Sequence, residues 1–369
     1  MIASLPTTVR AAVMTAPGRE LEIKAYPLLP PVTGGALVRV TCCTICRSDL
    51  HTWRGRRPGP TPAILGHEIV GEIAALAEDV THDSAGQPLA PGDRVTWTLH
   101  SSCGECYYCR EHQLPMKCLE LQKYGHDACD QPPHLQGGFA EYCHISAGTS
   151  LLKLPDNIPD TVAAPLNCAA ATVVAGWDAA ELKPGEHVLI QGAGGLGCYA
   201  AAMASFAGAE RIIVTDIHSE RLEFVRRFGA TDCINVASLT DEQIANWVRE
   251  LTGGFGVDCA MEVAGVPAVV PAGLASLRKG GRFVELGCSF PEATTSLDLS
   301  TILWNLLTIR GVHNYDFRHL QQAVDFVSQT IDRFPFDELT SRQFKLEDID
   351  QAIAAAEQNG LGRVAIVFD

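Results

Sequence analysis

The chain contains 369 residues with a formal net charge of −15, and 47% of its residues are hydrophobic. This length suffices for two domains of ordinary size, and the composition excludes a disordered chain. The acidic balance argues against a nucleic-acid-binding protein, and no apolar run approaches the length of about 18 residues that a membrane span requires. The first 20 residues lack the apolar core of a secretory signal, so we expect a cytoplasmic protein that binds neither nucleic acid nor membrane.

The first third of the sequence is rich in short strand-like runs that glycine and proline separate. These runs cover residues 36–41, 69–75, 93–98 and 139–145. They predict a small barrel-like β domain with long loops.

From about residue 161 the pattern changes to strands that alternate with helices. Strands are expected at 187–191, 211–215, 257–262 and 282–286, and helices at 196–206 and 220–228. This alternation predicts a parallel, doubly wound sheet. Beyond residue 310 the pattern predicts two helices and a closing strand, at 320–329, 348–358 and 363–368.

Three potential metal ligands lie far apart in the sequence, namely Cys46, His67 and Cys168. A scattered set of this kind suits a catalytic zinc site, because three protein ligands leave a fourth position for a reactant. Taken alone, each of these residues is more often a buried core residue than a ligand. Asp49 is a candidate partner that fixes the tautomer of His67, and Glu68 is a candidate for exchange with the oxygen at the open position.

A second group of cysteines is local and has the pattern Cys103-x2-Cys106-x2-Cys109-x8-Cys118. Four thiolates within reach of one loop suit a structural zinc ion that has no open position. The alternatives are an iron–sulfur site and four unrelated cysteines. Most of the other cysteines among the fourteen are expected to be small buried hydrophobic residues rather than disulfide partners.

A glycine-rich segment follows one predicted strand and opens a predicted helix. Its sequence is Gly192-Ala193-Gly194-Gly195-Leu196-Gly197. In this context the first glycine permits a tight turn, the second lets the backbone approach a pyrophosphate, and the last lets the helix pack closely on the strand. Asp216 ends the next strand, where a carboxylate accepts hydrogen bonds from the ribose hydroxyls and disfavours a 2′-phosphate, so NAD is favoured over NADP. The alternative for Asp216 is a surface residue that caps the next helix.

In combination, these motifs resemble the zinc-dependent medium-chain alcohol dehydrogenase family over essentially the whole chain. The resemblance is carried by Cys46-Arg47-Ser48-Asp49-Leu50-His51, Gly66-His67-Glu68-x2-Gly71-x5-Ala77-x2-Val80 and Gly137-Gly138-Phe139-Ala140-Glu141-Tyr142. It implies that Cys46, His67 and Cys168 bind a catalytic zinc ion with Glu68 adjacent, and that the cysteine cluster binds a structural one. The last two cysteines of the cluster are separated by eight residues, where the family usually has seven, so the detailed shape of this loop differs.

The resemblance also implies NAD as the coenzyme and adds candidate contacts to it. Arg221 is expected near the adenosine ribose, Thr172 and Leu196 near the nicotinamide, and Arg47 and Arg363 at the pyrophosphate. The implied reaction is hydride transfer between NAD and an alcohol or its aldehyde or ketone, with zinc as the Lewis acid.

A proton relay is the remaining part of the implied chemistry. Ser48 and His51 resemble the relay of the family, in which the proton passes from the alcohol through the hydroxyl and the coenzyme ribose to the imidazole and solvent. Histidine has a suitable intrinsic pKa for the last step.

The substrate is less well indicated. Arg54, Arg56 and Arg57 follow the relay histidine and predict either an anionic group on the substrate or a solvated loop or subunit contact. The loops resemble the branch of the family associated with phosphonate catabolism. The competing prediction is an uncharged secondary or alicyclic alcohol, for which the pocket walls would include Trp53, Leu99 and Trp304; polyol and threonine dehydrogenases are near relatives.

Two other functions fit the sequence less well. A non-catalytic protein on this fold predicts a damaged ligand set, and a zinc-free quinone reductase predicts the absence of Cys46 and of the cysteine cluster. The sequence retains all of these residues.

The expected fold is therefore α/β, with a GroES-like β-barrel catalytic domain and a Rossmann NAD-binding domain. The boundaries predicted are 1–165 for the catalytic domain with both zinc sites, 166–308 for the Rossmann domain, and 309–369 for the return to the catalytic domain. Coenzyme and substrate are expected between the domains. Residues 301–309 lie where this family pairs subunits, so a homodimer or a homotetramer is expected.

Overall fold

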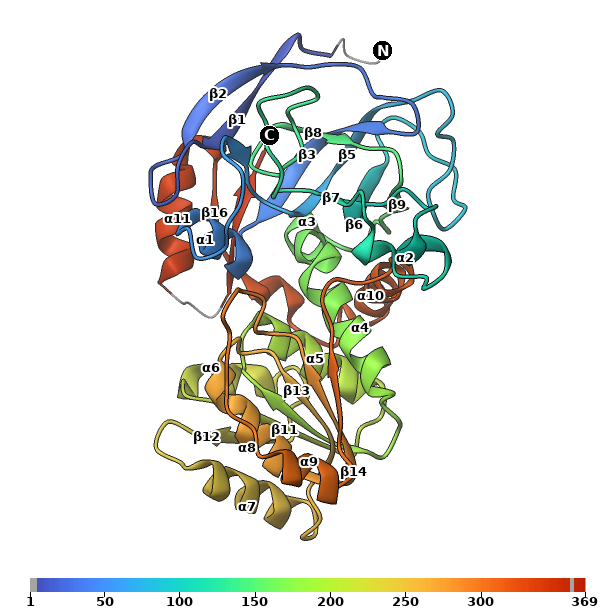
Figure 1. Cartoon of the computed structure of the whole chain (residues 1–369). Coiled ribbons are helices and arrows are strands. Elements are labelled where there is room, and N and C mark those ends of the chain that lie inside the picture. The colour runs from blue at the N-terminus through green and yellow to red at the C-terminus, as the bar shows by residue number, and fades with distance from the viewer. Residues whose placement is uncertain (1–4, 359–361, 369) are drawn as a thin grey trace. The chain divides into compact units, whose positions relative to one another are not determined.

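Two separate sheet systems organise residues 5–358 and 362–368, the part of the chain that the computed structural model describes (Figure 1). They belong to two units. The first unit contains the residues up to Cys168, Asp316–Ile331 and the residues from Phe336 onward. The second unit contains Ala169–Tyr315 and Asp332–Pro335. None of the helices in the described ranges is both long and apolar enough to span a bilayer.

The first unit is built around an 8-stranded sheet in the order β16-β17-β3-β5-β6-β7, with β8 paired to β3 and β9 to β6. Its strands are β3 (Ala36–Thr44), β5 (Glu68–Leu76), β6 (Arg94–Ser101), β7 (Gln122–Lys123), β8 (Tyr142–Ile145), β9 (Thr149–Lys153), β16 (Thr340–Phe344) and β17 (Arg363–Val367). A 3-stranded sheet contains β1 (Thr8–Met14), β2 (Glu22–Pro27) and β4 (Ala63–Ile64). The core between these elements is apolar and includes Val38, Ile69, Trp97 and Phe139.

Short helices connect the strands of the first unit. They are α1 (Arg47–Trp53), α2 (Tyr107–Arg110), η1 (Pro115–Lys117), α3 (Asp160–Ala163), η2 (Ala164–Asn167), α10 (Phe317–Thr330), η4 (Phe336–Leu339), η5 (Leu346–Asp348) and α11 (Ile349–Glu357). The late strand β17 pairs with β3, so that Ala365 lies opposite Thr44, which in turn lies opposite Glu68 of β5. Strand β17 therefore lies in the same sheet as β3, which leads to Cys46, and β5, which begins at Glu68.

The second unit contains a 6-stranded sheet in the order β12-β11-β10-β13-β14-β15, in which every neighbouring pair is parallel. Its strands are β10 (His187–Gln191), β11 (Arg211–Asp216), β12 (Asp232–Asn235), β13 (Val257–Glu262), β14 (Leu277–Glu285) and β15 (Thr308–Gly311). Its helices are α4 (Ala169–Ala180), α5 (Gly195–Phe206), α6 (Ser219–Arg226), α7 (Asp241–Leu251), η3 (Pro267–Val269), α8 (Val270–Ala275) and α9 (Leu299–Trp304).

Helices cover both faces of this parallel sheet. Leu189 of β10 packs in the same core cluster as Val248 of α7 and Leu274 of α8. The next residue, Ile190, points to the opposite face, where it approaches Gly197 of α5. Successive residues of the central strand are therefore both buried, which explains why β10 reads as a continuous apolar run.

The expected α/β fold with a β domain and a doubly wound sheet is confirmed. Two predicted strands are shorter than expected: 363–368 ends one residue earlier, as β17 (Arg363–Val367), and 139–145 is reduced to β8 (Tyr142–Ile145). The start of the predicted strand 139–145 is not paired in the sheet with β3, because the N–H groups of Gly138 and Phe139 donate instead to the carbonyl oxygens of Gly66 and Leu65. This turn lies directly beside the second metal-ligand motif.

Candidate active site and metal centres

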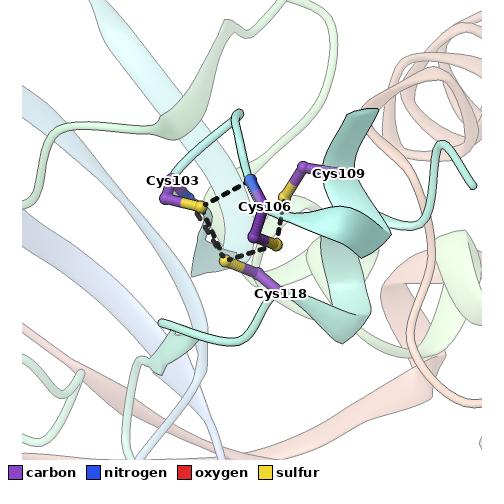
Figure 2. Close-up of side chains that lie close together, drawn as sticks. All are labelled: Cys103, Cys106, Cys109 and Cys118. Carbon is purple, nitrogen blue, oxygen red and sulfur yellow. Dashed lines mark hydrogen bonds between the residues drawn. The ribbon is translucent and has the colours of Figure 1, made fainter. Parts of the chain in front are cut away.

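The four cysteines of the local cluster converge in the loop that follows β6 (Figure 2). All four Sγ atoms lie within 4.8 Å of one another. The Sγ atoms of Cys106 and Cys109 are 3.5 Å apart, and the Sγ atom of Cys118 lies 3.4 Å from that of Cys103 and 3.9 Å from that of Cys106. A tetrahedron with Zn–S bonds of about 2.3 Å has edges of about 3.8 Å, so the donor set fits zinc.

Backbone amides around this cluster favour thiolates, whereas burial raises the pKa of Cys109 and of Cys118. The N–H groups of Cys103 and Glu120 donate to Cys118 Sγ, each at 3.3 Å. Amide donors from Leu119 and Cys109 lower the pKa of Cys106 to about 6. Gly104, with a φ of +75°, makes the left-handed turn between the first two cysteines.

A second group of donors forms from residues that are distant in sequence. Cys46, His67, Glu68 and Cys168 each place one donor atom within 4.8 Å of the others. Cys46 precedes α1, His67 and Glu68 stand at the start of β5, and Cys168 follows η2. The structure thus brings together the scattered ligands that the sequence singled out.

One buried carboxylate, that of Asp49, organises this group. Its Oδ1 lies 3.0 Å from His67 Nδ1 and accepts the Gly66 N–H at 3.2 Å, while its Oδ2 accepts the Cys46 N–H at 2.9 Å. Nδ1 therefore carries the proton toward Asp49, and Nε2 is left as the donor atom for a metal. Gly66 cannot be replaced easily, because its φ is +85° and a Cβ atom would lie 2.6 Å from the Phe139 ring.

Glu68 is held by two residues that the sequence alone did not connect with it. Thr44 Oγ1 donates to its Oε2 at 2.5 Å, and Arg363 Nη2 lies 2.9 Å from its Oε1. Burial raises the pKa of Glu68 to about 8, although the Arg363 guanidinium acts in the opposite direction. Arg363, which the resemblance placed at the coenzyme pyrophosphate, forms an ion pair with Glu68 here.

A further contributor from the fold is Asn167, the last residue of η2. Its Nδ2 donates to the carbonyl oxygens of His67 and Trp97, both at 3.1 Å. These bonds attach the segment that carries Cys168 to the two strands of the β domain. No spacing rule in the sequence points to Asn167, because its partners lie 70 and 100 residues away.

The two residues predicted for the proton relay lie on one face of α1. Ser48 Oγ is 3.2 Å from His67 Nε2, so the hydroxyl stands at the donor group itself. His51 follows three residues later and is half-buried. Burial, and then the positive charges of Arg47 and Arg56, lower its pKa, so the imidazole is neutral near pH 7. Arg47 itself is exposed at the first position of α1.

The glycine-rich segment forms the turn between β10 and α5. Gly192 has a φ of +114°, and a Cβ atom there would lie 2.9 Å from the Ala264 backbone. A Cβ atom on Gly197 would lie 2.0 Å from the Gly192 carbonyl oxygen. By contrast, Gly194 and Gly195 face open space, because a Cβ atom on either would meet no atom within 4 Å. The first and last glycines are required by packing, and the middle two leave the helix N-terminus accessible.

The carboxylate of Asp216 lies beside this turn at the end of β11. Its Oδ2 accepts the Ala193 N–H at 2.8 Å, and its Oδ1 accepts the His218 N–H at 2.9 Å. Asp216 therefore supports both the glycine turn and the start of α6. The other residues predicted to contact the coenzyme are half-buried on helices of the same unit, namely Thr172 on α4, Leu196 on α5 and Arg221 on α6.

The predicted pocket walls have different environments. Leu99 is buried in β6, and Trp53 is half-buried with its Nε1 donating to the Arg19 carbonyl at 2.8 Å. Trp304 lies on α9 of the second unit and is 75% exposed. Its neighbours on this surface include Leu303 and Leu306, which are also exposed.

Comparison with known proteins agrees with this geometry. Residues 33–156 match the family model of the alcohol dehydrogenase GroES-like domain, and residues 195–329 match that of zinc-binding dehydrogenases. The chain is 31% identical to 5-exo-hydroxycamphor dehydrogenase of Pseudomonas putida over 358 residues, which cover 95% of this chain and 96% of the relative. It is 31% identical to L-threonine 3-dehydrogenase of Aeromonas hydrophila over 341 residues, which cover 90% and 92% of the two chains.

Solved structures show the same similarity. An alcohol dehydrogenase from Thermotoga maritima superposes with a TM-score of 0.92 at 27% identity, over 98% of this chain and 99% of the other. With both zinc-donor groups assembled and the GroES-like and zinc-binding dehydrogenase models matched, the chain belongs to the zinc-dependent medium-chain alcohol dehydrogenase family.

Proposed function

We propose that this enzyme transfers hydride between NAD and the carbinol carbon of a secondary alcohol, or its ketone, at the Cys46–His67–Cys168 donor group. The single observation that carries the proposal is the convergence of these donors, with Glu68, within 4.8 Å. Bound zinc supplies a Lewis acid for the substrate oxygen, and bound NAD supplies the hydride acceptor. The cysteine cluster holds a second, structural zinc ion and stabilises the loop between β6 and β7.

The protein residues then have distinct tasks. Asp49 orients His67, and Arg363 and Thr44 hold the Glu68 carboxylate beside the other donors. Ser48 Oγ would accept the proton of the substrate hydroxyl while it passes its own proton on through the coenzyme ribose, and the neutral His51 imidazole would accept that proton and release it to solvent. The lowered pKa of His51 supports this role, because only the neutral ring accepts a proton.

The second unit is assigned the coenzyme. The space beside Gly194 and Gly195 is open at the start of α5, and a helix N-terminus stabilises the negative charge of a pyrophosphate bound there. The Asp216 carboxylate supports NAD over NADP, since it repels a 2′-phosphate. Thr172, Leu196 and Arg221 complete the proposed contacts in this unit, and Arg47 is proposed at the pyrophosphate.

The two curated relatives are named for substrates that differ in charge. One is named for hydroxycamphor, which is uncharged, and the other for threonine, which carries a carboxylate. Both fit the secondary alcohol proposed here, and neither is named for a phosphonate.

We also propose that the enzyme is a homo-oligomer located in the cytoplasm. The exposed apolar side chains of α9 adjoin β15, which is the edge strand of the parallel sheet. An exposed edge strand beside an apolar patch suits pairing with a second copy. All fourteen cysteines are thiols in the structure, which supports a reducing compartment.

The test combines metal content with turnover. The purified enzyme should contain two zinc ions per chain and reduce NAD, seen as NADH absorbance, with a panel of secondary alcohols. Cys46→Ala should lose one zinc ion and at least about 1,000-fold of the turnover, since an activated metal-bound reactant is lost. Cys42→Ala, a buried cysteine of β3 outside the donor group, is the matched control and should keep both. Full zinc content and activity in Cys46→Ala would disprove the proposal.

A further inference from the structure

A second imidazole lies against the proposed zinc-ligand histidine. The rings of His67 and His126 have centroids 4.9 Å apart. On its other side, His126 Nε2 is 3.0 Å from Nη1 of Arg57. One imidazole ring thus separates the Arg57 guanidinium from the metal-donor group.

The partners of His126 determine its protonation state. Its Nδ1 lies 2.8 Å from the carbonyl oxygen of Tyr124, which can only accept, so Nδ1 carries a proton. A guanidinium can only donate, so Nε2 accepts from Arg57 and carries none. His126 is therefore neutral. It fixes the position of Arg57 without compensating its positive charge.

Arg57 differs in this respect from its neighbours in the loop. Arg54 forms an ion pair with Glu357, and Arg56 is exposed. Arg57 is half-buried, and within residues 5–358 and 362–368 no carboxylate pairs with its guanidinium. Only this one of the three arginines matches the anion-binding prediction, whereas Arg54 and Arg56 match a surface loop.

A second cation stands in the same place. Lys123 of β7 is half-buried, and burial, followed by the charge of Arg57, lowers its pKa to about 8. The His126 N–H donates to the backbone carbonyl oxygen of Lys123 at 3.0 Å, so Lys123 lies in the same turn as the imidazole that holds Arg57. Asp127 is the nearby acid, and its Oδ2 accepts the backbone N–H of Lys123 at 2.8 Å.

We propose that Arg57, with Lys123 beside it, binds an acidic group of the alcohol substrate, and that the enzyme selects small hydroxy acids over uncharged alcohols. A fixed guanidinium forms two parallel hydrogen bonds with a carboxylate or a phosphonate, and a neighbouring ammonium adds charge. The inference rests on the proposed function, because it takes the hydroxyl oxygen to lie at the Cys46–His67–Cys168 group. Only the His126 ring lies between Arg57 and the metal-donor group, so the hydroxyl and the acidic group of the substrate should be separated by only a few bonds.

The test uses the enzyme loaded with zinc and NAD, and three alcohols of similar size: 3-hydroxybutanoate, 2-hydroxypropylphosphonate and 2-pentanol. Wild-type kcat/KM should be at least about 10-fold higher for one of the acids than for 2-pentanol. Arg57→Gln should raise KM for that acid about 10- to 100-fold, the equivalent of one lost charge-assisted bond, and leave 2-pentanol unchanged. Arg57→Lys should restore part of the loss. Which acid is preferred identifies the acidic group.

Arg54→Gln removes the same charge from the same loop and is the matched control, for which no change in the preference for the acid is expected. Calorimetry of ethylphosphonate and propanoate, which lack the hydroxyl, gives a readout without turnover: Arg57→Gln should weaken binding of the preferred anion by a similar factor. A wild-type preference for 2-pentanol, or equal effects of Arg57→Gln on all three alcohols, would overturn the inference while leaving the proposed function intact. Failure of all alcohols to reduce NAD would instead overturn the proposed function, and the calorimetry would still test Arg57.

Discussion

At the scale of single residues, His51 has the environment of a base that works at neutral pH. Its pKa is lowered by burial and by the charges of Arg47 and Arg56. In the proposed relay the neutral ring is the form that accepts the proton, so turnover should be lost only as the pH falls through a value below 6.5. His51→Gln should reduce kcat about 10- to 100-fold at pH 7 and less at pH 10, where hydroxide accepts the proton.

A companion variant checks the direction of this shift. Arg56→Gln removes one of the charges that disfavour the imidazolium, so the acid limb of the kcat profile should move to higher pH. The shift should be small, because Arg56 is exposed and solvent screens its charge. An acid limb that is the same in wild type, His51→Gln and Arg56→Gln would assign the limb to another group.

At the scale of elements, we expect the loop between β6 and β7 to depend on a bound metal rather than on a core. Its helices α2 and η1 are only 4 and 3 residues long, and no residue of α2 is buried. Segments this short have little stability of their own, so the four thiolates supply the constraint. Cys109→Ser should lower the zinc content from two ions to one and make this loop sensitive to protease.

The control for this variant is Cys233→Ser, a half-buried cysteine of β12 outside both donor groups. It should retain both zinc ions and the protease resistance of the loop. Retention of both ions by Cys109→Ser as well would show that the cluster does not bind metal.

Strand β8 carries a buried histidine, His144, whose environment disfavours the protonated imidazolium form. His144 is 2% exposed, and neither ring nitrogen has a hydrogen-bond partner among the described residues. Burial, with a smaller effect of His134, lowers its pKa from 6.5 to about 4. The unfolded chain therefore binds the proton more readily, so stability should fall as the pH drops from about 6.5 to about 4, by up to about 3 kcal/mol.

His144→Phe should remove this part of the acid dependence, measured by urea unfolding at pH 7 and pH 4.5. His82→Asn, at an exposed histidine, should not. The same loss of stability on acidification in wild type and His144→Phe would exclude His144 as the source.

At the scale of the whole molecule, the surface formed by α9 and the edge strand β15 exposes more large apolar side chains than we expect of a surface that faces water. Leu299, Leu303, Trp304 and Leu306 are each at least 70% exposed. A second copy that covers this surface would bury these side chains and pair the edge strand. Sedimentation should therefore show a dimer or tetramer, and Trp304→Asp should shift it toward monomer. Phe255→Asp, on a 77% exposed residue elsewhere in the second unit, should leave assembly unchanged, and a monomeric wild type would contradict the prediction.

Features that depend on local spacing or on the backbone of one residue could be predicted from the sequence. The four cysteines between residues 103 and 118 meet because one loop connects them. Gly192 and Gly197 are required because a Cβ atom at either would collide with backbone. The alternation of apolar strands and helices likewise predicted the parallel sheet, since each strand must be covered on both faces.

The contacts between side chains that are distant in sequence could be seen only in the folded protein. Arg363 reaches Glu68 because β17 pairs with β3, and β3 pairs with β5. Arg57 and Arg54 have different partners, although they are neighbours in one loop. Arg57 contacts His126, which is 69 residues later and lies against His67, whereas Arg54 pairs with Glu357. These contacts follow from strand pairing and loop packing across long stretches of chain, which residue spacing does not encode, whereas contacts within one turn or loop follow directly from it.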